Sequence, residues 1–236
     1  MPENPAPMLL SDLRDMTMNA STTLAELAVA HPGAARVFFR NRLDFCCGGR
    51  RNLDEVCRER QLDPDAILAA IQAEDPLVAD RPRWDEAPLP SLVDHIVTTY
   101  HHRLRAALPE LRAMARKVEQ RHGDKASCPR GLAAALEAMH ESLLDHLRKE
   151  EEILFPLIVS GLGEQAAAPV HVMELEHEHH REHLLALRSL TDDLTPPAEA
   201  CTTWRALYLG LLQLEQELME HIHLENNVLF RRALVA

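Results

Sequence analysis

Two copies of a His-x-x-x-Glu motif stand out in the second half of the sequence. The first copy is His146 with Glu150, and the second is His221 with Glu225. On a helix, residues four apart lie on the same face, so each motif offers an imidazole and a carboxylate to one partner. Both groups ligate transition metals, and carboxylates from facing helices can be shared between two ions. The spacing therefore predicts metal chemistry.

Two further histidines complete a candidate ligand set on two other helical segments. His101 and His177 occupy core-facing positions in runs whose apolar residues alternate at spacings of three and four. A buried glutamate without compensation is costly, and bound cations would supply the compensation. Six ligands are too many for tetrahedral zinc and suit two bridged octahedral ions, with iron preferred and manganese as an alternative. The predicted ligands are His101, His146, Glu150, His177, His221 and Glu225.

Other polar residues lie near these ligands in the sequence. His180 shares the core-facing row of His177 and is its one rival, but it is expected one turn deeper than the other ligands. Glu151, Glu152 and Glu176 either orient an imidazole or belong to a solvated face. Most of the remaining histidines in this half are expected at the surface, namely His95, His102, His122, His140, His171, His179, His183 and His223.

Four long helices must position the ligands. Their expected ranges are 91–122, 129–159, 169–193 and from after Pro197 to about 232. Pro109 should kink the first, and Pro169 should begin the third. Short connections predict antiparallel neighbours, and the ligands then share one level near one end of an up-down bundle. The expected core rows also contain Val97, four residues before His101, and Ile153, three after Glu150.

A small helical module is expected before the bundle. Its helices should cover 24–30, 32–42, 53–60 and 64–73, the first of them capped by Ser21 or Thr22. The predicted organisation is a flexible N-terminus at 1–20, a small domain at 21–74, a proline-rich linker at 75–90 and a bundle at 91–236. The fold class is all-α.

The small module contains the adjacent cysteines Cys46 and Cys47, followed by two glycines. With Arg50 and Arg51 nearby, they are expected to form an open, cationic thiol site that binds iron in transit, takes up a nitrosyl group or cycles to a disulfide. Structural packing is the alternative. Cys57, Cys128 and Cys201 are single, and packing or no specific role is expected for them.

Composition narrows the class of protein. The net charge of −12 disfavours nucleic acid as a partner. No apolar run is long enough to span a membrane, and the first residues do not resemble a signal peptide. Five cysteines, an odd number, form no disulfide framework and suit a reducing cytoplasm.

The quoted motifs resemble a known family. The run from His146 through Glu150 to Leu154-Phe155-Pro156 resembles the hemerythrin-like signature. The segment 44–49 around Cys46-Cys47, the loop 196–204, and the run from His221 to Phe230 resemble the iron-sulfur cluster repair di-iron proteins. The likeness covers nearly everything from Ser21 onward. It departs from the family pattern at the extra Cys57 and at Arg231, where a proline is expected.

The resemblance implies a hemerythrin-like four-helix bundle preceded by a double-cysteine domain. The six ligands would hold two iron ions in an oxo- and carboxylate-bridged centre, with Glu150 and Glu225 bridging. The implied function is repair of iron-sulfur clusters damaged by nitric oxide or oxidants, through iron donation to damaged or apo proteins in the cytoplasm. Reduction of nitric oxide, and reversible binding of nitric oxide or oxygen by a sensor or carrier, are the alternatives. Assembly as a homodimer is left open.

Overall fold

The computed structural model of the protein describes residues 18–78 and 82–235. Within these ranges the regular elements are helices, and no strand is formed. No helix in the described part combines the length and apolar character needed to cross a membrane. The chain divides into two compact units. One contains the residues up to Pro88 together with Ile222–Arg232, and the other contains Leu89–His221 with the residues from Ala233 onward.

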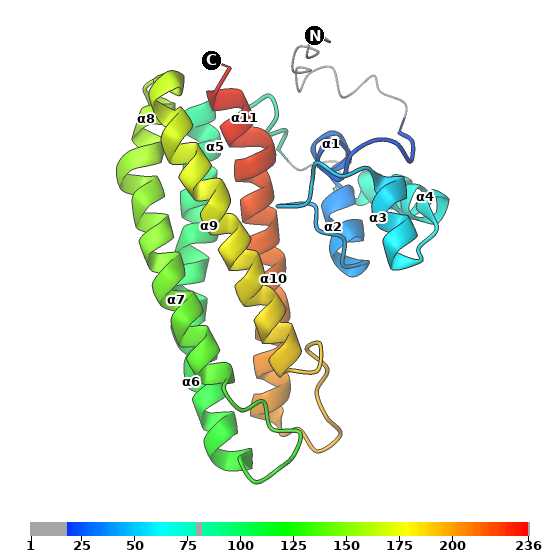
Figure 1. Cartoon of the computed structure of the whole chain (residues 1–236), viewed down its shortest axis with the longest axis vertical. Helices are drawn as coiled ribbons and strands as arrows, with labels where there is room; N and C mark the ends of the chain where they lie inside the picture. The colour runs from blue at the N-terminus through cyan, green and yellow to red at the C-terminus, as the bar shows by residue number, and fades with distance from the viewer. Residues whose placement is uncertain (1–17, 79–81, 236) are drawn as a thin grey trace. The chain divides into compact units, whose positions relative to one another are not determined.

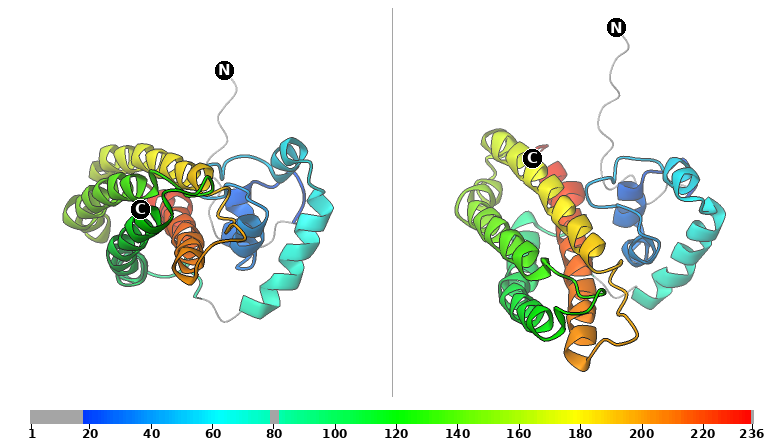
Figure 2. Two further views of the ribbon diagram at one scale, coloured as in Figure 1. Left: turned by 90° about the horizontal axis from the view of Figure 1, so that it is seen from below. Right: turned by 60° about the horizontal axis from the view of Figure 1, so that its bottom comes forward.

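Four long helices build the larger unit: α6 (His102–His122), α7 (Leu132–Lys149), α9 (Gly163–Leu190) and α10 (Thr202–Leu224). They lie side by side, and successive helices run in opposite directions (Figure 1; Figure 2). Their buried faces are leucine-rich rows such as Leu104 and Leu108 on α6, or Leu136 and Leu143 on α7. The predicted helical bundle is therefore confirmed.

Three π-helical segments interrupt helices that the sequence predicts as continuous. Ile96–His101 joins α5 (Leu89–His95) to α6, Glu150–Leu154 joins α7 to α8 (Phe155–Val159), and Glu225–Leu229 joins α10 to α11 (Phe230–Ala233). A π turn accommodates one extra residue, and such turns are frequent at functional sites. Each of the three contains one predicted metal ligand.

The extra residue moves the buried row by one position. The expected core residues Val97 and Ile153 are wrong: Ile153 is 50% exposed, and the buried residues are Ile96 and Leu154. Ile96 precedes His101 by five residues, as i→i+5 bonding requires, whereas α-helical periodicity predicted four. The π segments thus keep the ligands and their apolar neighbours on one inward face.

The third long helix begins earlier than predicted. It starts at Gly163, so Pro169 lies inside it, and it ends at Leu190 where 193 was expected. The backbone N–H groups of Gln165 and Ala166 already bond to the Leu162 carbonyl, which begins the helix before the proline. Pro169 is the seventh residue of the helix, so it removes one helical hydrogen bond, the one that an N–H at this position would donate to the Gln165 carbonyl.

The smaller unit contains α1 (Leu24–Ala30), α2 (Ala34–Arg40), α3 (Leu53–Arg60) and α4 (Pro64–Glu74), followed by a 3-10 turn at Asp75–Val78. The expected caps Ser21 and Thr22 are wrong. Thr23 caps α1, with its side chain and that of Glu26 bonding each other's backbone N–H. The expected flexible N-terminus, 1–20, lies outside the described residues except for 18–20.

The shifted row after Glu150 predicts opposite effects at two adjacent positions. Leu154→Ala should lower the free energy of unfolding by about 2–5 kcal/mol, because it leaves a cavity in the core. Ile153→Ala should change it by less than about 0.5 kcal/mol, because that side chain faces solvent. Chemical denaturation of both variants checks this. A larger loss for Ile153→Ala would contradict the π-helical register.

Candidate metal centre

Six polar side chains lie buried inside the bundle. Each of them is at most 1% exposed, although histidine and glutamate normally remain at the surface unless they have partners. They are the six residues predicted as ligands: His101, His146, Glu150, His177, His221 and Glu225. The structure brings all of them together.

The ligands come from all four long helical segments. His146, His177 and His221 lie on α7, α9 and α10, respectively. The other three lie at the boundaries of π segments, where His101 ends one and Glu150 and Glu225 each begin one. Each His-x-x-x-Glu pair therefore spans the junction from an α-helix into a π turn, which places the carboxylate beside its imidazole.

The six residues form two groups that share both carboxylates. His101 and His221 join Glu150 and Glu225 in one group, and His146 and His177 join the same two glutamates in the other. Within each group the potential ligand atoms all lie within 4.8 Å of one another. Two carboxylates common to two pairs of imidazoles are the arrangement expected for two bridged ions.

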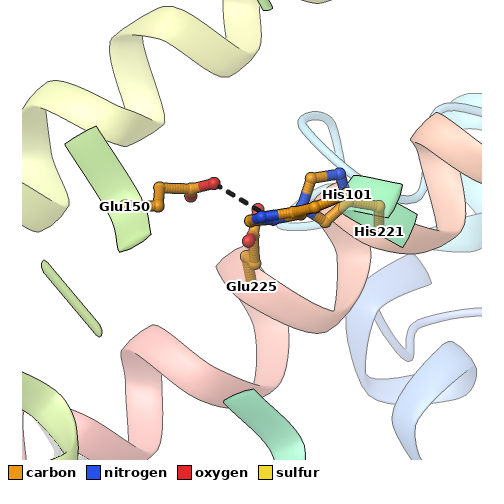
Figure 3. Close-up of side chains that lie close together, drawn as sticks. All are labelled: His101, Glu150, His221 and Glu225. Carbon is orange, nitrogen blue, oxygen red and sulfur yellow. Dashed lines mark hydrogen bonds and ion pairs between the residues drawn. The ribbon is translucent and has the colours of Figure 1, made fainter. Parts of the chain in front are cut away.

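The imidazoles turn their Nε2 atoms inward. His101 Nε2 and His221 Nε2 are 3.2 Å apart, and His146 Nε2 and His177 Nε2 are also 3.2 Å apart. Glu150 lies between the pairs, with Oε2 3.4 Å from His101 Nε2 and Oε1 3.5 Å from His146 Nε2. Figure 3 shows the first group, in which the carboxylate of Glu150 points at His101.

Two outer carboxylates fix the orientation of two imidazoles. Glu151 Oε1 accepts from His101 Nδ1 at 2.7 Å, and Glu176 Oε2 accepts from His146 Nδ1 at 2.9 Å. An ionised carboxylate only accepts hydrogen bonds, so each of these Nδ1 atoms carries a hydrogen, and Nε2 is the ring nitrogen left to face the cluster. Of the two roles left open for Glu151 and Glu176, the structure supports orientation of a ligand. Glu152 is exposed.

Both outer carboxylates are held in the ionised form. The hydrogen bond from His146, opposed by burial and reinforced by Lys149, lowers the pKa of Glu176 to about 2. Burial raises the pKa of Glu151, but hydrogen bonds from Arg105 and His101 outweigh it and lower that pKa below its ordinary value. Each glutamate therefore links a candidate ligand to a cation outside the centre.

The donor set fits a pair of transition-metal ions. Inward-facing imidazole nitrogens and two buried carboxylates bring both kinds of donor atom together in a space that the side chains shield from water. Imidazole with carboxylate suits iron and manganese better than it suits calcium, which takes oxygen ligands alone. The cluster therefore provides what a cation requires, and the ion would offset the cost of burying both glutamates.

His180 lies beside this cluster without joining either group. It is 1% exposed, its ring centroid is 4.7 Å from that of His146, and neither of its ring nitrogens has a hydrogen-bond partner among the described residues. Burial lowers the pKa of His180 to about 2, with the neighbouring histidines contributing, so its ring is neutral. This agrees with its expected place outside the ligand set.

His223 was expected at the surface, and this is wrong. It is 5% exposed, and its ring packs against Phe45 with centroids 5.5 Å apart. Burial lowers the pKa of His223 to about 4. It also contacts the amide of Asn227, which donates to the Phe45 carbonyl at 3.1 Å. Sequence analysis missed this contact, for which the only signal was the polar pair 226–227 after Glu225.

The cysteine turn differs from the open, cationic site expected from the sequence. Cys46 is buried and Cys47 is half-buried, with their sulfur atoms 3.8 Å apart. The carboxylate of Asp44 faces the thiols, with Oδ1 3.4 Å from Cys46 Sγ. The hydrogen bond with Cys47, burial, and the negative charge of Asp44 all raise the pKa of Cys46 well above its ordinary value. These contacts disfavour the thiolate form of Cys46, which is the form that binds metal.

The glycines after the cysteines are closely packed, which does not fit the open site expected from the sequence. A Cβ atom at Gly49 would lie 2.7 Å from the Phe45 carbonyl oxygen and 3.0 Å from Ala25 Cβ. Arg51 is directed away to Glu55 and Glu59. The three residues 44, 46 and 47 still place a carboxylate oxygen and two sulfurs within 4.8 Å of one another.

Comparison with known proteins agrees with this architecture. Residues 92–233 match the model of the hemerythrin HHE cation binding domain, and residues 20–75 match a domain of unknown function, DUF542. The range matched by the cation-binding domain contains all six candidate ligands.

Full-length relatives share both parts. The chain is 49% identical over 215 residues to the iron-sulfur cluster repair protein YtfE of Yersinia pseudotuberculosis serotype O:1b (strain IP 31758), covering 90% of this chain and 96% of the relative. It is 50% identical over the same length and coverage to the protein of that name from Musicola paradisiaca (strain Ech703). The chain therefore belongs to the YtfE family of iron-sulfur cluster repair proteins.

The outer carboxylates give a prediction with a matched control. Glu176→Gln should weaken metal binding about 10- to 100-fold, because the amide no longer fixes the Nδ1–H tautomer of His146 or balances Lys149. Glu178→Gln, two residues away on α9, carries the same change outside this contact and should bind metal as the wild type does. Competition with a chromogenic chelator measures both. Equal affinity in the two variants would contradict the role assigned to Glu176.

The buried cysteine gives a second prediction. Cys46 should react with a maleimide at neutral pH at least about tenfold more slowly than Cys201, because burial and a raised pKa keep it protonated. Cys201 is exposed and serves as the internal control. Peptide mapping of a time course gives both rates. Faster modification at Cys46 would show that the turn opens in solution.

Proposed function

We propose that this chain is a di-iron protein that helps to restore damaged iron-sulfur clusters by supplying iron. The observation that carries the proposal is the sharing of Glu150 and Glu225 by two pairs of buried imidazoles. The relatives that match 90% of the chain are named for cluster repair, which supports the assignment of this function.

Each ion would have two imidazoles of its own and a share in both carboxylates. His101 and His221 would hold one iron, and His146 and His177 the other. Iron held by imidazole and carboxylate can change redox state and bind small ligands such as nitric oxide or oxygen. Around it, Glu151 and Glu176 would keep two imidazoles deprotonated at Nε2, and the apolar rows of the bundle would exclude water.

The ligand chemistry supports donation of iron to other proteins. Thiolates bind iron more strongly than imidazole and carboxylate do, so the cysteines of an apo cluster site would compete effectively for it. Protonation of an imidazole or a carboxylate would also favour release, because metal ligands must be deprotonated. The partners in this proposal are damaged or apo iron-sulfur proteins.

A role for the cysteine turn in transferring iron would require a change in its structure. A protonated, buried Cys46 is a poor nucleophile, so a role for Cys46 and Cys47 as a relay for iron would require the turn to open first.

We place the protein in the cytoplasm, since five free cysteines suit a reducing compartment.

The proposed function is tested with an enzyme whose [4Fe–4S] cluster has been destroyed by nitric oxide. Iron-loaded wild-type protein should restore its activity without added iron, in proportion to the iron supplied. The Glu225→Gln variant should restore little, because it removes a carboxylate shared by both groups. Glu152→Gln, which changes an exposed residue next to Glu151, is the matched control and should act as the wild type does.

Two outcomes of this test would overturn the proposal. Sustained production of nitrous oxide from nitric oxide and a reductant, without recovery of the cluster enzyme, would identify a nitric oxide reductase. Recovery of the cluster enzyme to the same extent with metal-free protein would show that iron held by the chain is not what is delivered.

A further inference from the structure

A cysteine and a histidine lie together on the larger unit, outside the candidate metal centre. Cys201 Sγ and His122 Nε2 are 3.3 Å apart, although 79 residues separate them in the sequence. The ring of His122 rests against the buried Trp204 with centroids 5.2 Å apart, so its position is fixed by packing. Cys201 is exposed and free. An imidazole at hydrogen-bonding distance from an accessible thiol can hold the thiol proton.

Cys201 also lies at the N-terminus of a long helix. Cys201 directly precedes α10, and its carbonyl accepts the first helical hydrogen bond from Arg205 N at 3.0 Å. It therefore occupies the N-cap of a helix of 23 residues, where the backbone N–H groups carry partial positive charge. Thiolates at helix N-termini and beside histidine are the reactive ones.

The pair opens into a cavity of about 370 Å³. The lining residues that matter here are Cys201, His122, Thr203 and two cations one turn apart on α6, Lys117 and Arg121. Neither cation forms an ion pair with any described residue. Acidic groups close in sequence are engaged elsewhere: Glu119 accepts from Ala133 N at 2.9 Å, and Glu199 accepts from Ser127 Oγ at 2.6 Å.

Two cations without acidic partners are notable on a chain with a net charge of −12. They make the cavity locally positive and attract an anionic ligand. The volume suits a small organic molecule, since ligand cavities usually begin near about 300 Å³. The ligand that fits both features is a low-molecular-weight thiol carrying carboxylates, whose sulfur reaches Cys201 while its carboxylates contact Lys117 and Arg121.

We propose that Cys201, paired with His122, is a thiol–disulfide exchange site that takes up a small carboxylate-bearing thiol as a mixed disulfide. The Cys201 thiolate attacks one sulfur of the corresponding disulfide, forming a new S–S bond as the original S–S bond breaks. The departing thiolate takes the proton held by His122. Cys201 is oxidised to the mixed disulfide, and the incoming disulfide is reduced to one thiol, so no further reagent is consumed.

The test compares an anionic and a cationic disulfide on the full-length protein. Glutathione disulfide and cystamine are the probes, and peptide mapping measures the rate of adduct formation at each of the five cysteines. Cys201 should be the main site for glutathione, and Cys201→Ser should abolish that adduct. His122→Gln should slow both probes, because the thiol proton and the leaving group lose their partner.

Charge variants distinguish a cavity that attracts the anionic disulfide from a thiol that is only exposed. The double variant Lys117→Gln, Arg121→Gln should form the glutathione adduct at Cys201 about tenfold more slowly than the wild type. Its rate of adduct formation with cystamine should be unchanged or higher. Arg116→Gln is the matched control: it removes a cation from the same helix that pairs with Glu137 and does not line the cavity. Its rates should equal those of the wild type.

Two results would overturn the proposal. One is glutathione addition at Cys47 with Cys201 unmodified. The other is an equal ratio of the two probe rates in the wild type and in the Lys117→Gln, Arg121→Gln variant.

Discussion

The burial of two carboxylates among four imidazoles is the constraint on which the rest of this structure depends. Glu150 and Glu225 are both fully buried, and two negative charges in such a place would destabilise the bundle unless cations offset them. Bound cations would offset this cost, and the apolar rows around the cluster serve to seal and align it.

The helices adapt to this constraint through their π segments. A regular α-helix returns to the same face after three or four residues, and this spacing holds for the apolar rows in the middle of the bundle. Around His101, Glu150 and Glu225 the helix widens to admit one more residue. The ligand then faces inward without losing the apolar residue that packs beside it, as Ile96 and Leu154 show.

Much of the site could be predicted from residue types and spacing. Histidine and glutamate in otherwise apolar rows predict a buried polar cluster, because bound cations would offset the cost of two core glutamates. The π turns could not be predicted, since a single extra residue leaves the surrounding pattern nearly intact, and the expected Val97 and Ile153 were wrong for this reason. The surroundings of Cys46 were also missed. They depend on Asp44 and on carbonyl contacts with Asn226 and Asn227, residues 180 positions away.

The smaller unit contains both the cysteine turn and the segment that carries Glu225. The amides of Asn226 and Asn227 donate to the carbonyl of Cys46 at 3.3 and 3.4 Å, and these asparagines directly follow the glutamate. Any opening of the turn must therefore break hydrogen bonds made by the immediate neighbours of a candidate ligand.

The central claim, that these six residues hold two iron ions, is tested most directly by metal analysis with Mössbauer spectroscopy. Anaerobically purified wild-type protein and its Glu150→Ala and Glu225→Ala variants would be compared, with Glu152→Ala as the matched control. The account predicts about two irons per chain with magnetically coupled spectra in the wild type and the control. It predicts loss of that signal in both core variants. A single uncoupled ion, or zinc that survives both core substitutions, would contradict it.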